Sequence, residues 1–291
     1  MAMAIRQRRI LVFGGSSVLA ARFMDNFAET NYIKTFGRKD CDYVFDLLDP
    51  SFEDFPKEGF DVAILFGADF GGSSTEDLIR AEMVNAIGSL KVANFLIGSS
   101  VPHIIYISSV FAGLIKSDDY FSVYGLSKRH AEDLLTMACL LNGVALTVLR
   151  PSAIYDFEGT CQKHQPLLYG IIGKAVNGER LVVNGDQDPL RNYIFIDDVV
   201  EVIARSIERV PEGVFMCASP KNISLLEIAE FASCTVGKKL EYSFNTSLPN
   251  VKTLNLNVNM DLYEILDFYP KVSIEDGIAG IIKSRSEETN T

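Results

Sequence analysis

The chain has 291 residues, of which 48% are hydrophobic and 22% are charged. This much apolar side chain can bury a core, so the composition excludes a disordered chain and fits one large domain or two closely joined ones. Lys and Arg number 27 against 38 Asp and Glu, which gives a formal net charge of −11. We therefore expect no nucleic-acid partner and no general attraction to an anionic membrane.

The five cysteines and three histidines show no spacing typical of a metal site, because the chain has neither a CxxC pair nor an HExxH motif. We expect no bound metal and no disulfide, with the cysteines as buried thiols in a reducing compartment. The first apolar run, at 10–13, is too short for a secretory leader, and no other run is long enough to span a bilayer. The expected location is the cytoplasm, with no membrane partner.

Short apolar runs alternate with helical patterns over the first half of the chain. Ile, Val and Phe crowd runs that lack polar alternation, as in parallel strands buried on both faces; these runs are 10–13, 32–36, 62–66, 104–107 and 145–149. Helices are expected over 18–29, 75–96 and 124–141. The alternation predicts an α/β fold with a Rossmann-type doubly wound parallel sheet.

The regular alternation loosens after about residue 155, where prolines and glycines punctuate shorter elements. We expect a main domain over 1–155, completed by part of 194–219, and a smaller α+β lobe over most of 156–291. The residues at 284–291 are expected to form a disordered tail. Asp197 and Asp198 are expected to cap the helix that follows them.

A glycine turn directly follows the first strand, and a helix begins at once. The run Gly14-Gly15-Ser16-Ser17-Val18-Leu19-Ala20 is a degraded GxxGxxG pattern with small residues in place of two glycines. Such a turn lets backbone N–H groups and a helix N-terminus meet the pyrophosphate of a dinucleotide. We therefore expect cofactor contacts from Gly14, Ser16, Ser17, Val18 and Leu19, with a merely structural turn as the alternative.

A serine pair, Ser108-Ser109, follows the strand at 104–107, and Tyr124 and Lys128 come next on one helix face. A nearby ammonium lowers the pKa of a tyrosine, which can then exchange a proton with a carbonyl or carbinol while a serine holds the oxygen. The alternative is an incidental Tyr–Lys pair on a surface helix. The serine pair favours the catalytic interpretation.

Together these motifs resemble the extended short-chain dehydrogenase/reductase family of sugar-nucleotide epimerases, dehydratases and reductases, over nearly the whole chain. The resemblance implies that Ser109, Tyr124 and Lys128 are catalytic, that the main domain binds NAD(P) and that the second lobe binds substrate. Ser108 is the alternative catalytic serine, because the segment between Ser109 and Tyr124 is shorter than in many members. Both serines are expected to contact substrate.

The resemblance implies further cofactor contacts. Asp46-Leu47 is similar to the family's pair at the adenine, Phe66-Gly67-Ala68 to its small-residue turn beside the cofactor, and Asn85 to its asparagine near the nicotinamide. Tyr124 and Lys128 are also expected to touch the cofactor. In the second lobe, the resemblance implies that Arg191 binds the phosphates of a nucleotide sugar, since a planar guanidinium suits phosphate oxygens.

The second strand indicates which dinucleotide binds. NAD-binding members of this fold end that strand with a carboxylate for the ribose 2′-hydroxyl, whereas a 2′-phosphate needs a basic group. Here the strand runs into Gly37-Arg38-Lys39, with no carboxylate until Asp40. We therefore expect NADP, gripped by Arg38. NAD is the alternative, because a shifted strand end would bring Asp40 or Asp42 to the ribose.

The leading hypothesis is an NAD(P)-dependent oxidoreductase or epimerase that acts on a nucleotide-activated sugar, by reduction of a 4-keto sugar or by epimerisation. Dehydration is least favoured, because no acidic pair stands beside Ser109. The alternatives are a non-catalytic NADP-binding regulatory protein and a carbonyl reductase of a non-sugar substrate. The resemblance also implies a homodimer that pairs the helices at 75–96 and 124–141.

Overall fold

The computed structural model describes residues 7–289, which fall into two compact units. Unit 1 comprises the described part of Met1–Pro151 with Val199–Cys217 and Asp261–Phe268. Unit 2 comprises Ser152–Asp198, Ala218–Met260 and the described part of Tyr269–Thr291. The segment at 261–268, which we expected in the second lobe, therefore returns to unit 1.

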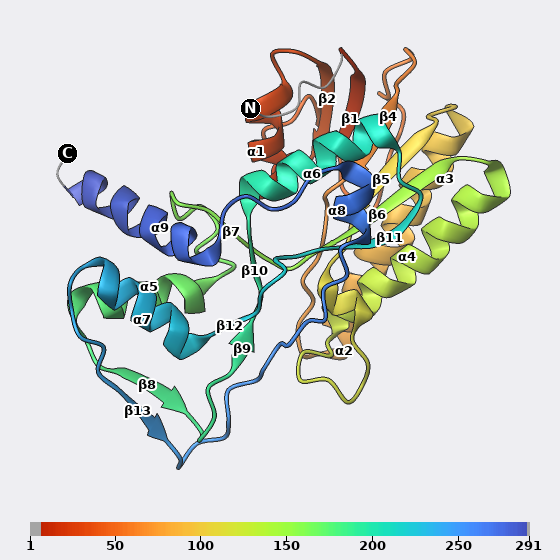
Figure 1. Cartoon of the computed structure of the whole chain (residues 1–291). Helices are drawn as coiled ribbons and strands as arrows, with labels where there is room; N and C mark the ends of the chain where they lie inside the picture. Colours follow the sequence, from red (N-terminus) through yellow and green to blue (C-terminus); the bar gives the residue numbers. More distant parts are fainter. Residues whose placement is uncertain (1–6, 290–291) are drawn as a thin grey trace. The chain divides into compact units, whose positions relative to one another are not determined.

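Unit 1 is built on a seven-stranded parallel sheet in the order β11-β6-β5-β4-β1-β2-β3 (Figure 1). Its strands are β1 (Arg9–Phe13), β2 (Tyr32–Gly37), β3 (Tyr43–Val44), β4 (Val62–Leu65), β5 (His103–Ile107), β6 (Ala145–Pro151) and β11 (Gly213–Cys217). The chain runs outward from β1 to β3 and then restarts on the other side of β1 at β4. The strand order thus reverses between β1 and β4, which confirms the predicted doubly wound Rossmann fold and marks the edge where such sheets bind ligands.

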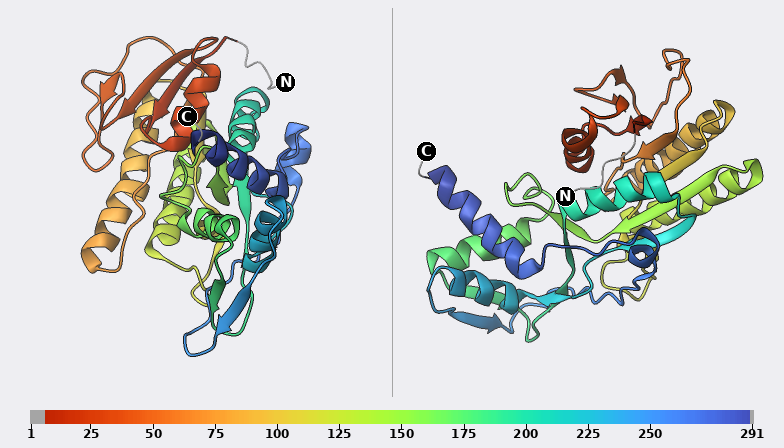
Figure 2. Two further views of the ribbon diagram at one scale, coloured as in Figure 1. Left: turned by 90° about the vertical axis from the view of Figure 1, so that its left-hand side faces the viewer. Right: turned by 45° about the horizontal axis from the view of Figure 1, so that its top comes forward.

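Helices cover the sheet of unit 1 because its strands are apolar on both faces. On one face, Leu11, Ala63 and Tyr106 share a core cluster with Ala93 of α3 (Ser89–Gly98) and Leu135 of α4 (Val123–Asn142). These two helices lie side by side (Figure 2). The helix α1 (Val18–Phe27) lies beyond the other face in Figure 1. Two more elements, α6 (Ile196–Arg209) and α8 (Asp261–Leu266), complete the unit, although α6 begins in unit 2.

The helix expected over 75–96 is present but is not uniform. It consists of α2 (Thr75–Ala81), a π-helical stretch over Glu82–Gly88 and α3. Ser74 begins it with a capping box, in which its hydroxyl accepts from the N–H of Asp77 and the Asp77 carboxylate accepts from the N–H of Ser74. Wide π turns are frequent at functional sites, and this one carries the fully buried Asn85.

Unit 2 is a small α+β lobe with three two-stranded sheets. They pair β7 (Ala153–Tyr155) with β10 (Tyr193–Phe195), β9 (Leu190–Arg191) with β12 (Ile223–Ser224), and β8 (Leu181–Asn184) with β13 (Tyr242–Asn245). Its helices are α5 (Pro166–Asn177), α7 (Leu225–Thr235) and α9 (Ile274–Thr289), besides the first turn of α6.

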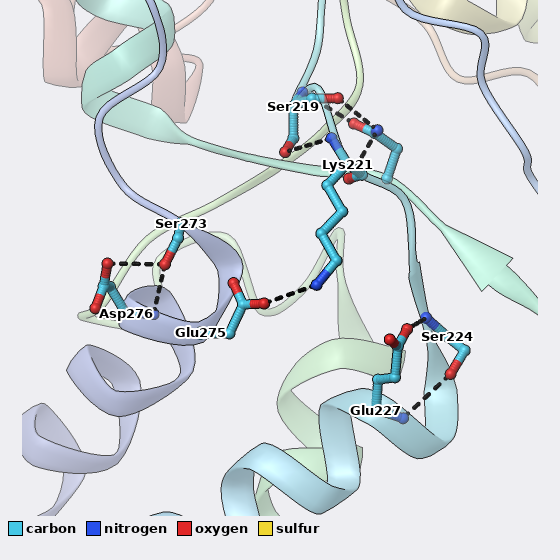
Figure 3. A network of polar contacts seen from close by, with 8 residues as sticks. Ser219, Lys221, Ser224, Glu227, Ser273, Glu275 and Asp276 are labelled. Carbon is cyan, nitrogen blue, oxygen red and sulfur yellow. Dashed lines mark hydrogen bonds and ion pairs between the residues drawn. The ribbon is translucent and has the colours of Figure 1, made fainter.

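Polar contacts fix the starts of α7 and α9 in unit 2 (Figure 3). Ser224 and Glu227 form a capping box at α7, and the Ser273 hydroxyl accepts from a backbone N–H in the first turn of α9. Lys221 donates to Glu275 over 2.9 Å and so links the segment before α7 to α9. The two helices are therefore held by their N-terminal ends as well as by packing.

Three expectations are corrected. Residues 284–289, expected to be disordered, continue α9, while 290–291 lie outside the described residues. The Asp198 carboxylate accepts from the N–H groups of Lys271 and Val272, which lie far along the chain from the helix that we expected it to cap. Cys234 is exposed and Cys41 is partly exposed, so only three of the five free thiols are buried.

Between residues 7 and 289 no helix is long and apolar enough to cross a membrane. In the same range, no group of three or more His, Cys, Asp or Glu side chains is placed to hold a metal ion.

Candidate active site

The turn after β1 leaves the sheet at the strand-order reversal. Gly14 adopts a φ of +83°, and its N–H donates to the carbonyl of Phe36 over 2.7 Å. A Cβ at this position would lie 2.5 Å from the backbone nitrogen of Gly67, so only glycine fits. Ser17 caps α1 by accepting from the N–H of Ala20. The expected residues Gly14, Ser16, Ser17, Val18 and Leu19 thus form one turn and the first residues of a capped helix.

The turn after β4 lies directly against the first turn. A Cβ on Gly67 would meet the side chain of Leu47 at 2.5 Å, so this glycine also permits a close approach. The neighbouring Asp46 is exposed and accepts from the N–H of Leu48 over 3.0 Å, which holds its own turn. Phe66 is buried, whereas Ala68 is partly exposed. The structure therefore brings the segments at 14–19, 46–47 and 66–68 together at one edge of the sheet.

The side chain of Asn85 makes hydrogen bonds only to other parts of unit 1 in the structure described. Its amide nitrogen donates to the carbonyl of Asp69 over 2.7 Å and to the hydroxyl of Ser127 over 2.9 Å, and its amide oxygen accepts from the N–H of Asp69. These bonds tie the loop after β4 to α4. In the structure Asn85 thus fixes the surroundings of Tyr124 through Ser127, whose hydroxyl donates to the Tyr124 carbonyl.

Ser109 and Tyr124 meet above the end of β5. Ser109 begins the 3₁₀ turn η2 (Val110–Gly113), where its hydroxyl accepts from the N–H of Phe111 over 3.2 Å, and it lies beside the half-buried Tyr124 on the first turn of α4. The two elements approach closely because the next residue is Gly125, where a Cβ would lie 2.5 Å from the carbonyl oxygen of Phe111. Burial raises the pKa of Tyr124 to about 12, and the neighbouring Ser109 hydroxyl opposes that rise.

Lys128 lies one helical turn after Tyr124 and is fully buried. Its ammonium donates to the carbonyl of Ile107 over 2.7 Å and stands 4.5 Å from the centre of the Tyr106 ring. Burial lowers the pKa of Lys128 to about 7, and the carboxylate of Glu132 acts in the opposite direction. We expected Lys128 to lower the pKa of Tyr124, but in the structure that effect comes from Ser109.

Ser108 points to a different partner from Ser109. Its hydroxyl donates to the carboxylate of Glu132, which is also bound by the guanidinium of Arg150 through Nε at 2.9 Å and through Nη2. No sequence motif indicated this ion pair. The available signal was a glutamate at i+4 from Lys128 together with an arginine at the end of the next strand.

Aromatic rings surround Tyr124. The Phe70 ring lies 5.0 Å from it, and Phe111 meets it edge-on at 6.4 Å, with Tyr120 stacked on Phe111. Phe70 is 61% exposed, which is unusual for a phenylalanine and leaves an open aromatic surface beside the ring of Tyr124. No motif in the sequence identified these rings, because they come from three separate loops or turns.

The exposed cations Arg38 and Lys39 follow β2, and the carboxylates of Asp40 and Asp42 come shortly after them. Arg38 is exposed directly after the strand, and Asp40 is exposed with a φ of +51°. The Asp42 carboxylate accepts from the N–H and the hydroxyl of Thr35 over 2.9 Å each and pairs with Lys34 over 3.2 Å. Asp42 is thus bound to the side of β2.

Arg191 is the expected site residue that lies in unit 2, whereas the others lie in unit 1. It is buried, and its Nη1 donates to the carbonyls of Leu190 and Lys252 over 2.7 and 2.6 Å. These bonds join β9 to a segment sixty residues further along the chain. Arg191 therefore has a structural role in holding unit 2 together.

The family model described as "NAD dependent epimerase/dehydratase family" matches residues 10–218. Among curated proteins, UDP-glucuronic acid decarboxylase 2 from Arabidopsis thaliana is 26% identical over 167 residues. That match covers 56% of this chain and 36% of the plant protein, so the chain spans about a third of that relative.

Solved structures share the fold over almost the whole chain. The structure of RMD from Pseudomonas aeruginosa complexed with NADPH has a TM-score of 0.78 and 19% identity, and covers 97% of this chain and 100% of that one. UDP-glucose 4-epimerase from Thermotoga maritima with UDP-glucose has a TM-score of 0.74 and 20% identity, and covers 97% and 99%. At this level of identity the likeness establishes the fold.

Proposed function

The chain belongs to the NAD dependent epimerase/dehydratase family, and from that premise we propose that it is an NAD(P)-dependent enzyme acting on a nucleotide-activated sugar. The proposed reaction is reduction of a 4-keto sugar or epimerisation. The observation that carries the proposal is that the Ser109 hydroxyl lies beside Tyr124, with Lys128 buried one helical turn away. The NADPH and the UDP-glucose in two structures of the same fold support the cofactor class and the substrate class.

In this proposal Tyr124 moves the proton. In a reduction the Tyr124 hydroxyl gives a proton to the sugar carbonyl oxygen. In an epimerisation Tyr124 starts as the tyrosinate, takes a proton from the sugar hydroxyl and later returns it. Ser109 would donate a hydrogen bond to the same oxygen, and Lys128 would bind the nicotinamide ribose of the cofactor. The pyridine nucleotide, when bound, supplies or accepts the hydride. The exposed Phe70 ring beside Tyr124 provides an apolar wall for the sugar.

The turn after β1 suits a pyrophosphate, because Gly14 and Gly67 have no side chains and α1 presents its N-terminus there. Gly14, Ser16, Ser17, Val18 and Leu19 would hold the pyrophosphate. Asp46 and Leu47 would line the adenine side, and Phe66, Gly67 and Ala68 the ribose side. Asn85 would act by holding the loop at Asp69 against α4.

We favour NADP over NAD as the cofactor. Arg38 follows β2 and is exposed, so its guanidinium is available to a 2′-phosphate. Asp42, which would favour NAD by accepting from the ribose 2′-hydroxyl, is instead bonded to Thr35 and Lys34. Asp40 is the one neighbouring carboxylate that keeps NAD as the alternative.

Two further parts of the proposal concern the substrate and the assembly. Arg191 would contact the phosphates of the nucleotide sugar through the guanidinium that also bonds two carbonyls of unit 2. A homodimer would form through the helices at 75–96 and 124–141, and the exposed Met137, Leu140 and Leu141 of α4 support such a contact. Light scattering at micromolar concentration should give a dimer, and a persistent monomer would contradict this part.

A thermal-shift screen tests the function. UDP-, dTDP- and GDP-sugars are each added with NADPH or NADH, and ligands that raise the melting temperature are then assayed for turnover. The proposal expects at least one nucleotide sugar to stabilise the protein and to be converted. Turnover of a non-sugar carbonyl alone would replace it with a carbonyl reductase. Cofactor binding without turnover of any substrate would replace it with a regulatory protein.

A further inference from the structure

A buried ion pair lies directly behind the serine pair. Glu132 on α4 is 2% exposed, and its carboxylate accepts from the Ser108 hydroxyl and from two nitrogens of the Arg150 guanidinium. Arg150 stands near the end of β6, and Ser108 directly follows β5, the neighbouring strand. One carboxylate thus joins α4 to the ends of two strands, and the next residue after Ser108 is Ser109.

The same carboxylate acts on Lys128. Glu132 and Lys128 are four residues apart on α4, which places them on one face of the helix. The negative charge of Glu132 raises the pKa of Lys128 against the burial that lowers it. The Lys128 ammonium also stands over the ring of Tyr106 and donates to the carbonyl of Ile107.

Stability alone is a poor explanation of this arrangement. The cost of removing two charges from water offsets most of their mutual attraction. A buried ion pair therefore adds little to the stability of the fold compared with apolar side chains of similar size. In contrast, a carboxylate in this position does two things that an apolar side chain cannot. It fixes the serine hydroxyl by a hydrogen bond, and it offsets part of the charge of an ammonium buried beside it.

We infer that Glu132 is a positioning residue of the active site, which anchors the end of β5 that carries Ser109 and serves as counter-ion to the Lys128 ammonium. This inference rests on the proposed function, because that function gives Ser109 and Lys128 their roles. Arg150 shares the carboxylate and so limits how strongly Glu132 acts on Lys128.

The test is the titration of Lys128 in the cofactor-free protein, followed by NMR of ¹³C-labelled lysine side chains, with Lys128→Arg to identify the resonance. Glu132→Gln keeps the shape of the side chain and an acceptor for Ser108 but removes the charge. Lys128 should then titrate at least one pH unit lower than in the wild type, a tenfold change in its protonation equilibrium. An unchanged titration in folded Glu132→Gln would overturn the inference.

Glu201→Gln is the matched control. Glu201 is also a buried carboxylate of unit 1 and pairs with Arg205 on α6 over 2.8 Å. Its replacement should leave the titration of Lys128 unchanged. If Glu201→Gln lowered the titration pH of Lys128 as much as Glu132→Gln does, the loss of any buried carboxylate would have this effect. That result would overturn the inference.

Arg150→Gln is an independent variant for the case that Glu132→Gln does not fold, and it should shift the titration of Lys128 in the opposite direction. Without the guanidinium, the carboxylate is left to Lys128, which should titrate at higher pH than in the wild type. An equal or lower titration pH would overturn the inference. Neither measurement needs a sugar substrate, so a failure of the counter-ion role shows in the titration and a failure of the proposed function shows in the nucleotide-sugar screen.

In the working enzyme, Glu132→Gln should also move the alkaline limb of the kcat/KM profile to lower pH, because Lys128 loses its proton earlier. A merely structural loss would lower the whole profile without moving this limb, and that result would overturn the counter-ion role.

Discussion

Gly14 and Gly67 meet backbone to backbone, since a Cβ on Gly14 would lie 2.5 Å from the nitrogen of Gly67. These residues belong to the turns that follow β1 and β4, the two strands between which the strand order reverses. The contact brings the two turns of the proposed cofactor site together at the edge of the sheet. It also explains why position 14 requires glycine, whereas Ser17 and Ala20 can stand at the two later glycine positions of the GxxGxxG pattern.

Gly14→Ala should therefore destabilise the protein and abolish NADPH binding. Gly143→Ala is the matched control, because Gly143 also has a positive φ, of +65°, but has nothing within 4 Å of its would-be Cβ. Positive φ alone costs a non-glycine residue about 1–2 kcal/mol, and Gly14→Ala adds the clash with Gly67. Urea unfolding should thus show a larger loss for Gly14→Ala. Equal losses would contradict the close contact as the cause.

The sheet of unit 1 was predictable because its strands are buried on both faces and appear as continuous apolar runs. The expected strands at 10–13, 32–36 and 145–149 agree with β1, β2 and β6 to within two residues at each end. The serine pair, Tyr124 and Lys128 were also visible, because the spacing that led us to propose them as catalytic lies within one strand–turn–helix segment. Signals of this kind lie within short stretches of sequence, so they can be recognised without knowledge of the fold.

Contacts between distant segments were not predictable in this way. The strands β9 and β12 are two residues long and have no periodicity of their own, so their pairing depends on the tertiary fold. Glu132 and Arg150 belong to no local motif, and they meet because α4 crosses the ends of neighbouring strands. The hydrogen bond from the Thr35 N–H to the Asp42 carboxylate bears on the choice between NADP and NAD. It likewise joins residues on opposite sides of the loop that follows β2.

The cofactor's phosphate should be recognised by Arg38. NADPH should bind at least tenfold tighter than NADH, a difference of about 1.4 kcal/mol, and Arg38→Ala should erase most of that gap. Fluorescence titration with both nucleotides measures the ratio, and Lys91→Ala, at an exposed lysine on α3, controls for a general loss of positive charge. Equal wild-type affinities, or an unchanged ratio in Arg38→Ala, would show that Arg38 does not bind the phosphate.

Lys128 should make the cofactor-free protein less stable, because its charge is buried. Its pKa is lowered from 10.5 to about 7, so the penalty is complete below pH 7 and shrinks as the pH rises toward 10.5. Lys128→Met should therefore raise the melting temperature, and by more at pH 6 than at pH 9. At about 1.4 kcal/mol per pKa unit the gain at pH 6 is on the order of a few kcal/mol. A variant that is no more stable than the wild type at pH 6 would contradict this.

Arg191→Ala should weaken nucleotide-sugar binding by about 1.5–3 kcal/mol, as expected for lost charge-assisted hydrogen bonds, and leave dinucleotide binding unchanged. It should also lower the melting temperature, because the carbonyls of Leu190 and Lys252 lose their donor. Calorimetric titration of both ligands separates the effects. If both affinities fall equally, Arg191 is a structural residue and not a substrate ligand.

The central claim is that Tyr124 carries the proton, and turnover by Tyr124→Phe tests it most directly. The substitution keeps the ring between Phe70 and Phe111 but removes the hydroxyl that Ser109 contacts. Tyr120→Phe, next to the same aromatic cluster, is the matched control. With the best substrate of the screen, Tyr124→Phe should lose roughly 10²–10⁴-fold in kcat at unchanged NADPH affinity, while Tyr120→Phe keeps most of its activity. A Tyr124→Phe variant that turns over at near the wild-type rate would contradict the account.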